Sequence, residues 1–267
     1  MRTDDYRVRP GHPVDLAQWA TDDDGGLTKD EAKGRFRELN DRLEVLQEKL
    51  YADGGHKLLV VLQATDTGGK DGTIRRVTDG LNPQGVKVAS FKRPTEEELA
   101  HDYLWRVHAH TPGNGEIVIF NRSHYEDVLV VRVHELVPEE RWARRYDHIR
   151  SFEQLLVDEG TTVVKLFLHL SKREQAERLQ ARLDDPDKHW KFSVGDLAER
   201  EHWDDYQEAF RVMLERTSTD ATPWYVIPAD RKWFRDLLVA QILVDQLDAL
   251  DLAYPPNPDD LSGIVIT

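Results

Sequence analysis

The chain has 267 residues, 39% of them hydrophobic, which is enough for one sizeable α/β domain with a real core. Its formal net charge of −14 argues against a nucleic-acid-binding protein, because such proteins displace counterions with a basic surface. The absence of cysteine excludes disulfides, thiolate chemistry and zinc sites of the cysteine type. No apolar run approaches 18 residues and the first residues contain no apolar signal segment, so we expect a soluble, cytoplasmic protein that does not bind membranes.

The first predicted element is a helix that begins after Thr28. Thr28 and Glu31 have the spacing of a capping box, in which each side chain accepts a hydrogen bond from the other residue's backbone N–H. The apolar residues that follow have a near-heptad spacing: Phe36, Leu39, Leu43, Leu46 and Leu50. Such a stripe could form a dimer seam, although packing against the main domain is the commoner outcome. We interpret residues 1–55 as an N-terminal helical extension of a single domain, 1–267.

Five short apolar runs, rich in β-branched residues, predict β-strands: 57–63, 86–91, 116–120, 162–170 and 224–228. Most of them are apolar throughout rather than alternating, which is typical of strands covered on both faces. Helical patterns fill the intervals between the strands, and the pattern over 141–160 ends at a glycine, a common residue just past a helix. Strands that alternate with helices predict βαβ units and therefore an α/β fold with a parallel sheet.

The segment QATDTGGKDGTIRRV, residues 63–77, lies between the first strand and a helix, which is the setting of a phosphate-binding loop. Gly68 and Gly69 allow the backbone to approach a phosphate closely, and Lys70 follows them directly. An ordinary glycine turn between strand and helix is the alternative. The lysine directly after the double glycine favours the phosphate loop.

Three residues of this loop depart from the standard pattern. Ala64 stands at the first glycine, and Asp71 stands where a magnesium-binding hydroxyl belongs. Asp66 adds a carboxylate inside the loop. A carboxylate holds Mg²⁺ more firmly than a neutral hydroxyl, so Asp66 is the candidate metal ligand.

The third strand ends in IFNRSHYEDV, at the edge where P-loop enzymes hold the acid that organises the metal. Asn121 occupies that position, Arg122 follows it, and Glu126 lies one turn further on. Arg122 could clamp a phosphoryl group with both arms of its guanidinium. The alternative is a surface arginine paired with Glu126.

Two further basic groups follow strands. Lys92 and Arg93 come just after the second strand, at the edge where α/β sheets bind ligands. The second group follows the fourth strand, within residues 171–195, and contains Arg178, Arg182, Lys188 and Lys191. A solvated charged helix would explain such a run, but in a P-loop kinase this position belongs to a helical lid that closes over phosphates.

Five segments, in this order, resemble the type 2 polyphosphate kinase family: TDTGGKDGTIRRV, FKRPTEEELAHDYLWR, FNRSHYEDVLVVRVHE, ERLQARLDDPDKHWKFS and TPWYVIPADRKWFR. The match covers nearly the whole chain, from the N-terminal helix to the last helix. The SHYED form, with Glu126, is similar to the class III branch, whose members accept nucleoside mono- and diphosphates. The resemblance implies a three-layer P-loop kinase fold with a five-stranded parallel sheet and a helical lid.

The resemblance also implies roles for individual residues. Asp66, Lys70, Arg122 and Arg178 match the family's catalytic positions. The positions expected to bind phosphate or polyphosphate are Gly68, Gly69, Asp71, Gly72, Thr73, Arg75, Lys92, Arg93, Arg132, Arg182 and Lys188.

The family's pattern is broken at Asn121, where other branches have aspartate. This departure leaves open what completes the metal site with Asp66. Glu126 is the nearest replacement, and it could instead orient the acceptor phosphate. We therefore expect Asn121 and Glu126 at the acceptor nucleotide, and Asp66 and Glu126 at the metal.

The function that the resemblance implies is reversible, Mg²⁺-dependent phosphoryl transfer from inorganic polyphosphate to AMP or ADP, with Mn²⁺ as a possible substitute. We expect polyphosphate and nucleotides as partners and a homo-oligomer, either a dimer or a tetramer. One alternative is an ATP-dependent nucleoside monophosphate kinase, which would have the same fold. Another is a non-catalytic module that senses nucleotide or phosphate through an inactive loop.

Two other groups of residues invite a functional reading. Three histidines are clustered in the sequence: His101, His108 and His110. They could form a zinc site, but we prefer the interpretation that they lie on a helix face. The aromatic residues are expected to be mostly core, with one near the lid stacking the base: Trp190, Trp203, Tyr206 and Trp224.

Overall fold

The computed structural model describes residues 1–259, 261–262 and 264–266. Its centre is a five-stranded, all-parallel sheet with the strand order β2-β3-β1-β4-β5. The strands are β1 (Lys57–Ala64), β2 (Val86–Ser90), β3 (Ile117–Asn121), β4 (Thr161–His169) and β5 (Trp224–Pro228). The bounds of each strand differ by at most one residue from the predicted run, and the parallel pairing confirms the expected α/β class.

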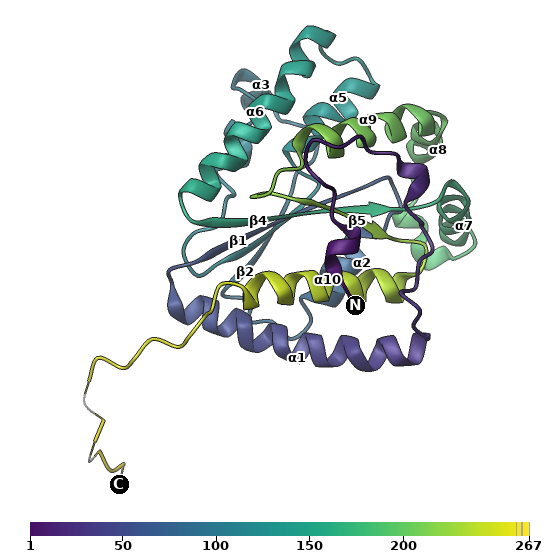
Figure 1. Ribbon diagram of the computed structural model, residues 1–267. Helices are drawn as coiled ribbons and strands as arrows, with labels where there is room; N and C mark the ends of the chain where they lie inside the picture. The colour runs from purple at the N-terminus through teal and green to yellow at the C-terminus, as the bar shows by residue number, and fades with distance from the viewer. Residues whose placement is uncertain (260, 263, 267) are drawn as a thin grey trace.

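Helices cover both faces of the sheet and make a three-layer molecule (Figure 1). One face carries α1 (Lys29–Asp53) and α10 (Lys232–Asp248), together with α2 (Lys70–Val77). The other face carries α6 (Glu139–Asp158) and α9 (Trp203–Thr217). Each face of the sheet therefore has its own apolar core.

Alternate side chains of β1 enter the two cores. Leu58, Val60 and Leu62 belong to the core beneath α1 and α10. Leu59 and Val61 belong to the core beneath α6 and α9. Each buried aliphatic side chain stabilises the fold by about 1.5–3 kcal/mol, which explains why strands covered on both faces are apolar throughout.

Helix α1 begins with the expected capping box. The hydroxyl of Thr28 accepts a hydrogen bond from the backbone N–H of Glu31 at 3.3 Å, and the Glu31 carboxylate accepts from the N–H of Thr28 at 2.8 Å. The apolar stripe of α1 packs into the core that it shares with α10, where Phe36, Leu43 and Leu46 are buried. The stripe is therefore used within the chain and does not support a dimer seam.

The remaining elements are short and lie mostly around the carboxyl edge of the sheet. They are η1 (Thr3–Tyr6), η2 (Leu16–Gln18), α3 (Glu96–Ala100), α4 (Trp105–His108), η3 (His124–Val128), α5 (Val130–Val133), α7 (Lys172–Leu183), η4 (Pro186–Lys191) and α8 (Val194–Glu201). Because parallel strands end at one edge, the loops after β1, β3 and β4 meet there. None of the helices within the described ranges is long and apolar enough to cross a membrane.

The expectation that the clustered histidines lie on one helix face is wrong. His101 follows the end of α3 and stacks on Trp105, whereas His108 ends α4 and contacts Phe152. His110 packs edge-on against Phe91. A break between α3 and α4 separates residues that a continuous helix would have aligned.

Candidate active site

The loop between β1 and α2 is closely packed at its two glycines. Gly69 has φ +98°, in the left-handed region, and a Cβ there would lie 1.9 Å from Nη1 of Arg235. A Cβ on Gly68 would lie 2.5 Å from the Cβ of Ala64. Lys70 then begins α2, and its Nζ donates to the carbonyl of Ala64 at 3.1 Å. The glycines thus allow the chain to fold back over itself at a helix N-terminus, the geometry that binds phosphate.

Two buried arginines support this loop from beneath. Arg178 of α7 donates to the carbonyl of Thr67 at 3.1 Å, and Arg235 of α10 donates to the carbonyl of Gly68 at 3.5 Å. Burial, together with the nearby charge of Arg178, lowers the pKa of Arg235. Arg178 was expected at the reacting phosphate, but the structure places its guanidinium against the backbone carbonyls of Thr67 in the loop and of Ala229 and Asp230 after β5.

Arg235 was not predicted. A signal was present, because the adjacent charged residues Arg235 and Asp236 stand between apolar residues in the last helix, KWFRDLLVAQILV. Its neighbour Asp236 accepts from Arg235 and also from the hydroxyl of Thr73 in α2, at 3.3 Å. Thr73, expected at phosphate, is buried and is thus engaged in holding α2 to α10.

Arg122 occupies the centre of the site. It is a non-glycine residue with φ +62°, a strained conformation that occurs most often at functional sites. Its Nη2 lies 3.1 Å from Oδ1 of Asp66, and its Nη1 lies 3.8 Å from Oε2 of Glu126. The pairing with Glu126 that the spacing allowed is present, and it joins Arg122 to the loop carboxylate as well.

The charged groups around Arg122 are partly buried. Burial raises the pKa of Glu126, against the opposing influence of Arg122 and Lys70. Burial also lowers the pKa of Lys70, with a further contribution from the positive charge of Arg122. Oppositely charged groups held at low solvation act strongly on any charge that enters among them.

Two residues of the expected site bond to each other. Asn121, at the end of β3, donates its amide hydrogen to Oδ1 of Asp71 at 2.7 Å. The residue that replaces the family's aspartate is therefore joined to the residue that replaces the usual loop hydroxyl. The spacing of 50 residues between them gave no indication of this pairing.

Two cavities meet at the site, and Asp66, Arg122 and Asp196 line both. The first has a volume of about 310 Å³ and is walled by apolar, aromatic and acidic side chains that include Glu126, Leu129, Glu199, Trp203, Tyr206 and Phe210. The second has a volume of about 770 Å³ and is walled by the loop glycines and by basic side chains: Lys70, Lys92, Arg93, Arg182 and Lys191. The sequence predicted most of the basic wall, and Glu126, Trp203 and Tyr206 of the other wall were among its candidates, whereas Glu199 and Phe210 were not.

The predicted lid contributes to both cavities. Arg182 of α7 lies 3.4 Å from the carboxylate of Asp196 in α8, and it also donates to the carbonyl of Lys191 at 3.2 Å. The helical segments of this region continue to the end of α8 at Glu201, beyond the expected boundary at residue 195. Glu199 of α8 accepts a hydrogen bond from Tyr206 at 2.7 Å, which connects the lid to α9.

Besides the buried Thr73, three of the expected phosphate-binding residues lie outside both cavities. Arg75 is exposed on α2, and Lys188 is exposed on η4, where it pairs with Asp185. Arg132 stacks on the ring of Trp142 at 4.9 Å and donates to the hydroxyl of Tyr146 at 3.3 Å. Their contact with a phosphate chain stays a prediction.

The aromatic residues divide between core and cavity. Trp224 is fully buried in the core, as expected for most of them. Trp203 and Tyr206 line the first cavity, and Trp190 of η4 is exposed at the second. Trp203 is itself buried, so Tyr206 and Trp190 have the more accessible rings.

The carboxylates at the site suit a magnesium ion. Asp66 and Glu126 both line the first cavity and both approach Arg122. Among the described residues, no group of three or more His, Cys, Asp or Glu side chains could hold a metal. Mg²⁺ in phosphotransferases is held by one or two carboxylates and completes its coordination with substrate phosphates and water, so two carboxylates fit this ion.

The family model for Polyphosphate kinase 2 (PPK2) matches residues 26–254 of the chain. Two similar relatives cover nearly the full length. The AMP/ADP-polyphosphate phosphotransferase of Meiothermus ruber is 58% identical over 265 residues, which is 98% of each chain. The ADP-polyphosphate phosphotransferase of Rhodopseudomonas palustris is 45% identical over 271 residues, covering 96% of this chain and 93% of the relative.

A solved structure gives the same result. The crystal structure of Polyphosphate Kinase 2 from Arthrobacter aurescens TC1 superposes with a TM-score of 0.92 at 45% sequence identity, over 96% of this chain and 92% of that one. The resemblance seen in the five sequence segments is confirmed, and so is the P-loop kinase fold.

Proposed function

Because the chain belongs to the polyphosphate kinase 2 family, we propose that it transfers a phosphoryl group between polyphosphate and nucleoside mono- or diphosphates at the junction of its two cavities. The observation that carries this proposal is the placement of Asp66 and Arg122 in the wall common to both cavities. A donor in one cavity and an acceptor in the other would bring their terminal phosphates together there.

The reaction needs little covalent work from the protein. An oxygen of the acceptor's terminal phosphate attacks the terminal phosphorus of the polyphosphate chain. The bond from that phosphorus to its bridging oxygen breaks, and the chain leaves shortened by one phosphate and carrying the negative charge. Catalysis consists of holding the two phosphates in line and stabilising the charge on the moving group.

The basic side chains supply that stabilisation. Lys70 lies at the N-terminus of α2, and Arg122 is held between Asp66 and Glu126 at 3.1 and 3.8 Å. An arriving phosphate competes with these carboxylates for the guanidinium. Arg178 and Arg235, beneath the loop, hold its carbonyls and add positive charge behind the phosphate site.

We assign the metal site to Asp66 and Glu126, the two carboxylates that converge on Arg122. These two carboxylates would hold Mg²⁺, which would supply positive charge to the phosphate oxygens. The chain's own residues orient those phosphates, and Asn121, bonded to Asp71, lines the second cavity.

The proposal also includes a cytoplasmic location, where nucleoside phosphates are made and consumed, and a homo-oligomeric state, either dimer or tetramer. The oligomer does not use the apolar stripe of α1, since Phe36, Leu43 and Leu46 are buried within the chain. Light scattering on the purified protein measures the oligomeric state directly.

A panel of donors and acceptors tests the proposal. AMP and ADP are each incubated with polyphosphate or with ATP, with and without Mg²⁺, and the products are resolved by ion-exchange chromatography. We expect ADP and ATP to form from polyphosphate only with the metal. Activity with ATP and none with polyphosphate would identify a nucleoside monophosphate kinase, and nucleotide binding without turnover would identify a sensing module.

Substitutions test the assigned residues. Asp66→Asn and Lys70→Met are each expected to lower kcat by about 100-fold or more, as the loss of a group that stabilises the transition state does. The matched controls are Asp41→Asn and Lys33→Met on the exposed face of α1, which remove the same charges far from the site. Near-normal rates for both loop variants would refute the assignment.

A further inference from the structure

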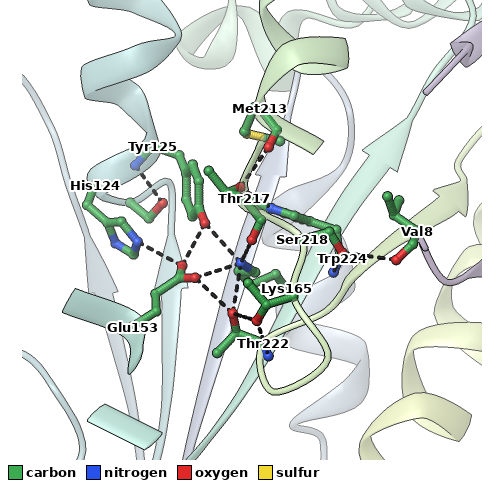
Figure 2. Close-up of polar contacts among 12 residues, drawn as sticks. Val8, His124, Tyr125, Glu153, Lys165, Met213, Thr217, Ser218, Thr222 and Trp224 are labelled. Carbon is green, nitrogen blue, oxygen red and sulfur yellow. Dashed lines mark hydrogen bonds and ion pairs between the residues drawn. The ribbon is translucent and has the colours of Figure 1, made fainter. Parts of the chain in front are cut away.

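A lysine lies in the middle of the central sheet. Lys165 is a residue of β4 whose side chain is fully buried, and its Nζ lies 2.6 Å from Oε2 of Glu153, which is fully buried in α6 (Figure 2). Neither residue lines the two cavities of the candidate site. The phosphoryl-transfer chemistry described above leaves this ion pair without a role.

The pair is fully hydrogen-bonded. Lys165 also donates to the carbonyl of Thr217 at 2.7 Å. Glu153 accepts from the hydroxyls of Tyr125 and Thr222, at 2.7 and 3.1 Å, and its Oε1 lies 3.2 Å from Nε2 of His124. Figure 2 shows these groups converging on the two charges from α6, β4, η3, the end of α9 and the loop before β5.

Stability alone does not explain a buried pair of this kind. Removing two charges from water costs about as much as their attraction returns, and apolar residues of similar volume often stabilise a core equally well. Burial opposes the charge on Glu153, and Lys165 nevertheless holds the pKa of that carboxyl below its usual value. An apolar pair, however, could not form hydrogen bonds with the polar groups around it.

Two of the anchored groups belong to the turn that carries the site. His124 and Tyr125 lie between Arg122 and Glu126 in the chain, within η3. The side chains of His124 and Tyr125 are fully buried, whereas Arg122 and Glu126 lie at the first cavity. Because the turn has only five residues, fixing the buried side chains of His124 and Tyr125 also fixes the direction in which Arg122 and Glu126 point.

The turn is also held from the side of β1. In the orientation that satisfies both ends of its amide, Gln63 donates to Oε1 of Glu126 at 3.0 Å and accepts from the backbone N–H of Ser123 at 3.1 Å. Gln63 therefore holds the turn at Ser123 and Glu126, and the bond from Tyr125 to Glu153 holds it at a residue between those two.

We propose that the buried Glu153–Lys165 pair is a positioning device that holds Arg122 and Glu126 in their catalytic orientation through Tyr125 and His124. Arg122 needs such support because its φ of +62° is strained, and a strained residue keeps its conformation only when its surroundings enforce it. The inference rests on the proposed function of the junction between the cavities.

Two matched substitutions test it. Tyr125→Phe removes the hydroxyl that joins η3 to Glu153 and keeps the ring packed against Trp224. Thr222→Val removes a hydroxyl from the same pair on the side away from η3. Tyr125→Phe loses the hydrogen bonds of that hydroxyl with Glu153 and Lys165, and Thr222→Val loses those with Glu153, Lys165 and Thr219. Both variants thus remove a hydroxyl that contacts both members of the pair, and they differ in whether it belongs to the catalytic turn.

We expect Tyr125→Phe to lower kcat about tenfold with either acceptor, since a small misplacement of a catalytic group is costly, while the KM for polyphosphate changes less than twofold. Thr222→Val should keep kcat within twofold of the wild type. Assays at 15 °C, with the folded fraction measured by circular dichroism, separate a change in turnover from a loss of folded protein.

Equal kcat values for the two variants would overturn the inference, as would a loss of rate in Tyr125→Phe that equals its loss of folded protein. These outcomes differ from a failure of the proposed function, because wild-type protein inactive with polyphosphate would refute that function before any variant is compared.

Discussion

At Gly69, a single hydrogen atom is all that the loop accommodates. The residue combines φ +98° with the close approach of a buried arginine side chain from α10. Loop conformation and charge placement are therefore set by the same contact, since moving Arg235 to admit a methyl group would displace the charge behind the phosphate site.

Gly69→Ala is expected to destabilise the protein by about 1–3 kcal/mol, because both the left-handed backbone and the overlap with Arg235 are unfavourable. It should also weaken ADP binding measured by calorimetry. The control is Gly26→Ala, which has φ +70° but no described atom within 4 Å of the new Cβ. Urea unfolding of the two variants separates backbone strain from the overlap, and equal losses would show that the contact with Arg235 is unimportant.

Among the elements, α6 and β4 are joined by charge as well as by apolar contact. Glu153 and Lys165 lie inside the core between them, with both side chains fully buried. The pair adds a directional polar contact between the helix and the sheet, which apolar side chains alone do not provide.

Lys165→Met alone should lower the free energy of unfolding by about 3–5 kcal/mol, because it leaves the Glu153 carboxylate buried without its partner. The double variant Lys165→Met/Glu153→Gln should regain most of that loss, since glutamine keeps the shape and the acceptor for Tyr125 without the charge. Urea unfolding measures both. A double variant whose loss equals the sum of the two single losses would contradict the pairing energy.

The first turn of α1 depends on its capping box. Thr28→Ala is expected to cost about 1 kcal/mol, because the backbone N–H of Glu31 loses its side-chain acceptor and the turn that leads to Ala32 frays. Thr28→Ser keeps the hydroxyl and should be nearly neutral. Thermal unfolding compares the two; an alanine variant with the melting temperature of the serine variant would exclude a role for the cap.

At the scale of the whole molecule, the strand positions were predictable because each buried run carries its own apolar pattern. The order of the strands in the sheet was not predictable from these patterns, since it depends on which helix covers which face. The site follows the same rule. Asp66, Lys70 and Arg122 were found from motifs next to strand ends, whereas the bond between Asn121 and Asp71 joins residues 50 apart and leaves no local pattern.

The buried His169 makes the stability of the whole molecule depend on pH. Burial lowers its pKa in the folded state below the value of about 6.5 expected in the unfolded chain. The folded state therefore binds this proton less readily, and the stabilising contribution, present above about pH 6.5, is lost as the pH falls through the lowered folded-state pKa.

Urea unfolding between pH 5 and 8 should show a smaller acid loss of stability in His169→Gln than in the wild type. His148→Gln, on the exposed side of α6, is the control and should follow the wild type. If the stability of His169→Gln depends on pH as strongly as that of the wild type, His169 is not the source of the acid loss of stability.

The wall that the two cavities have in common has a kinetic consequence. Because each cavity has its own lining and they meet only at a few side chains, donor and acceptor can enter without either displacing the other. Both substrates must then be bound before turnover, and no phosphorylated enzyme accumulates between them. Initial rates measured at several concentrations of both substrates should give intersecting rather than parallel double-reciprocal lines.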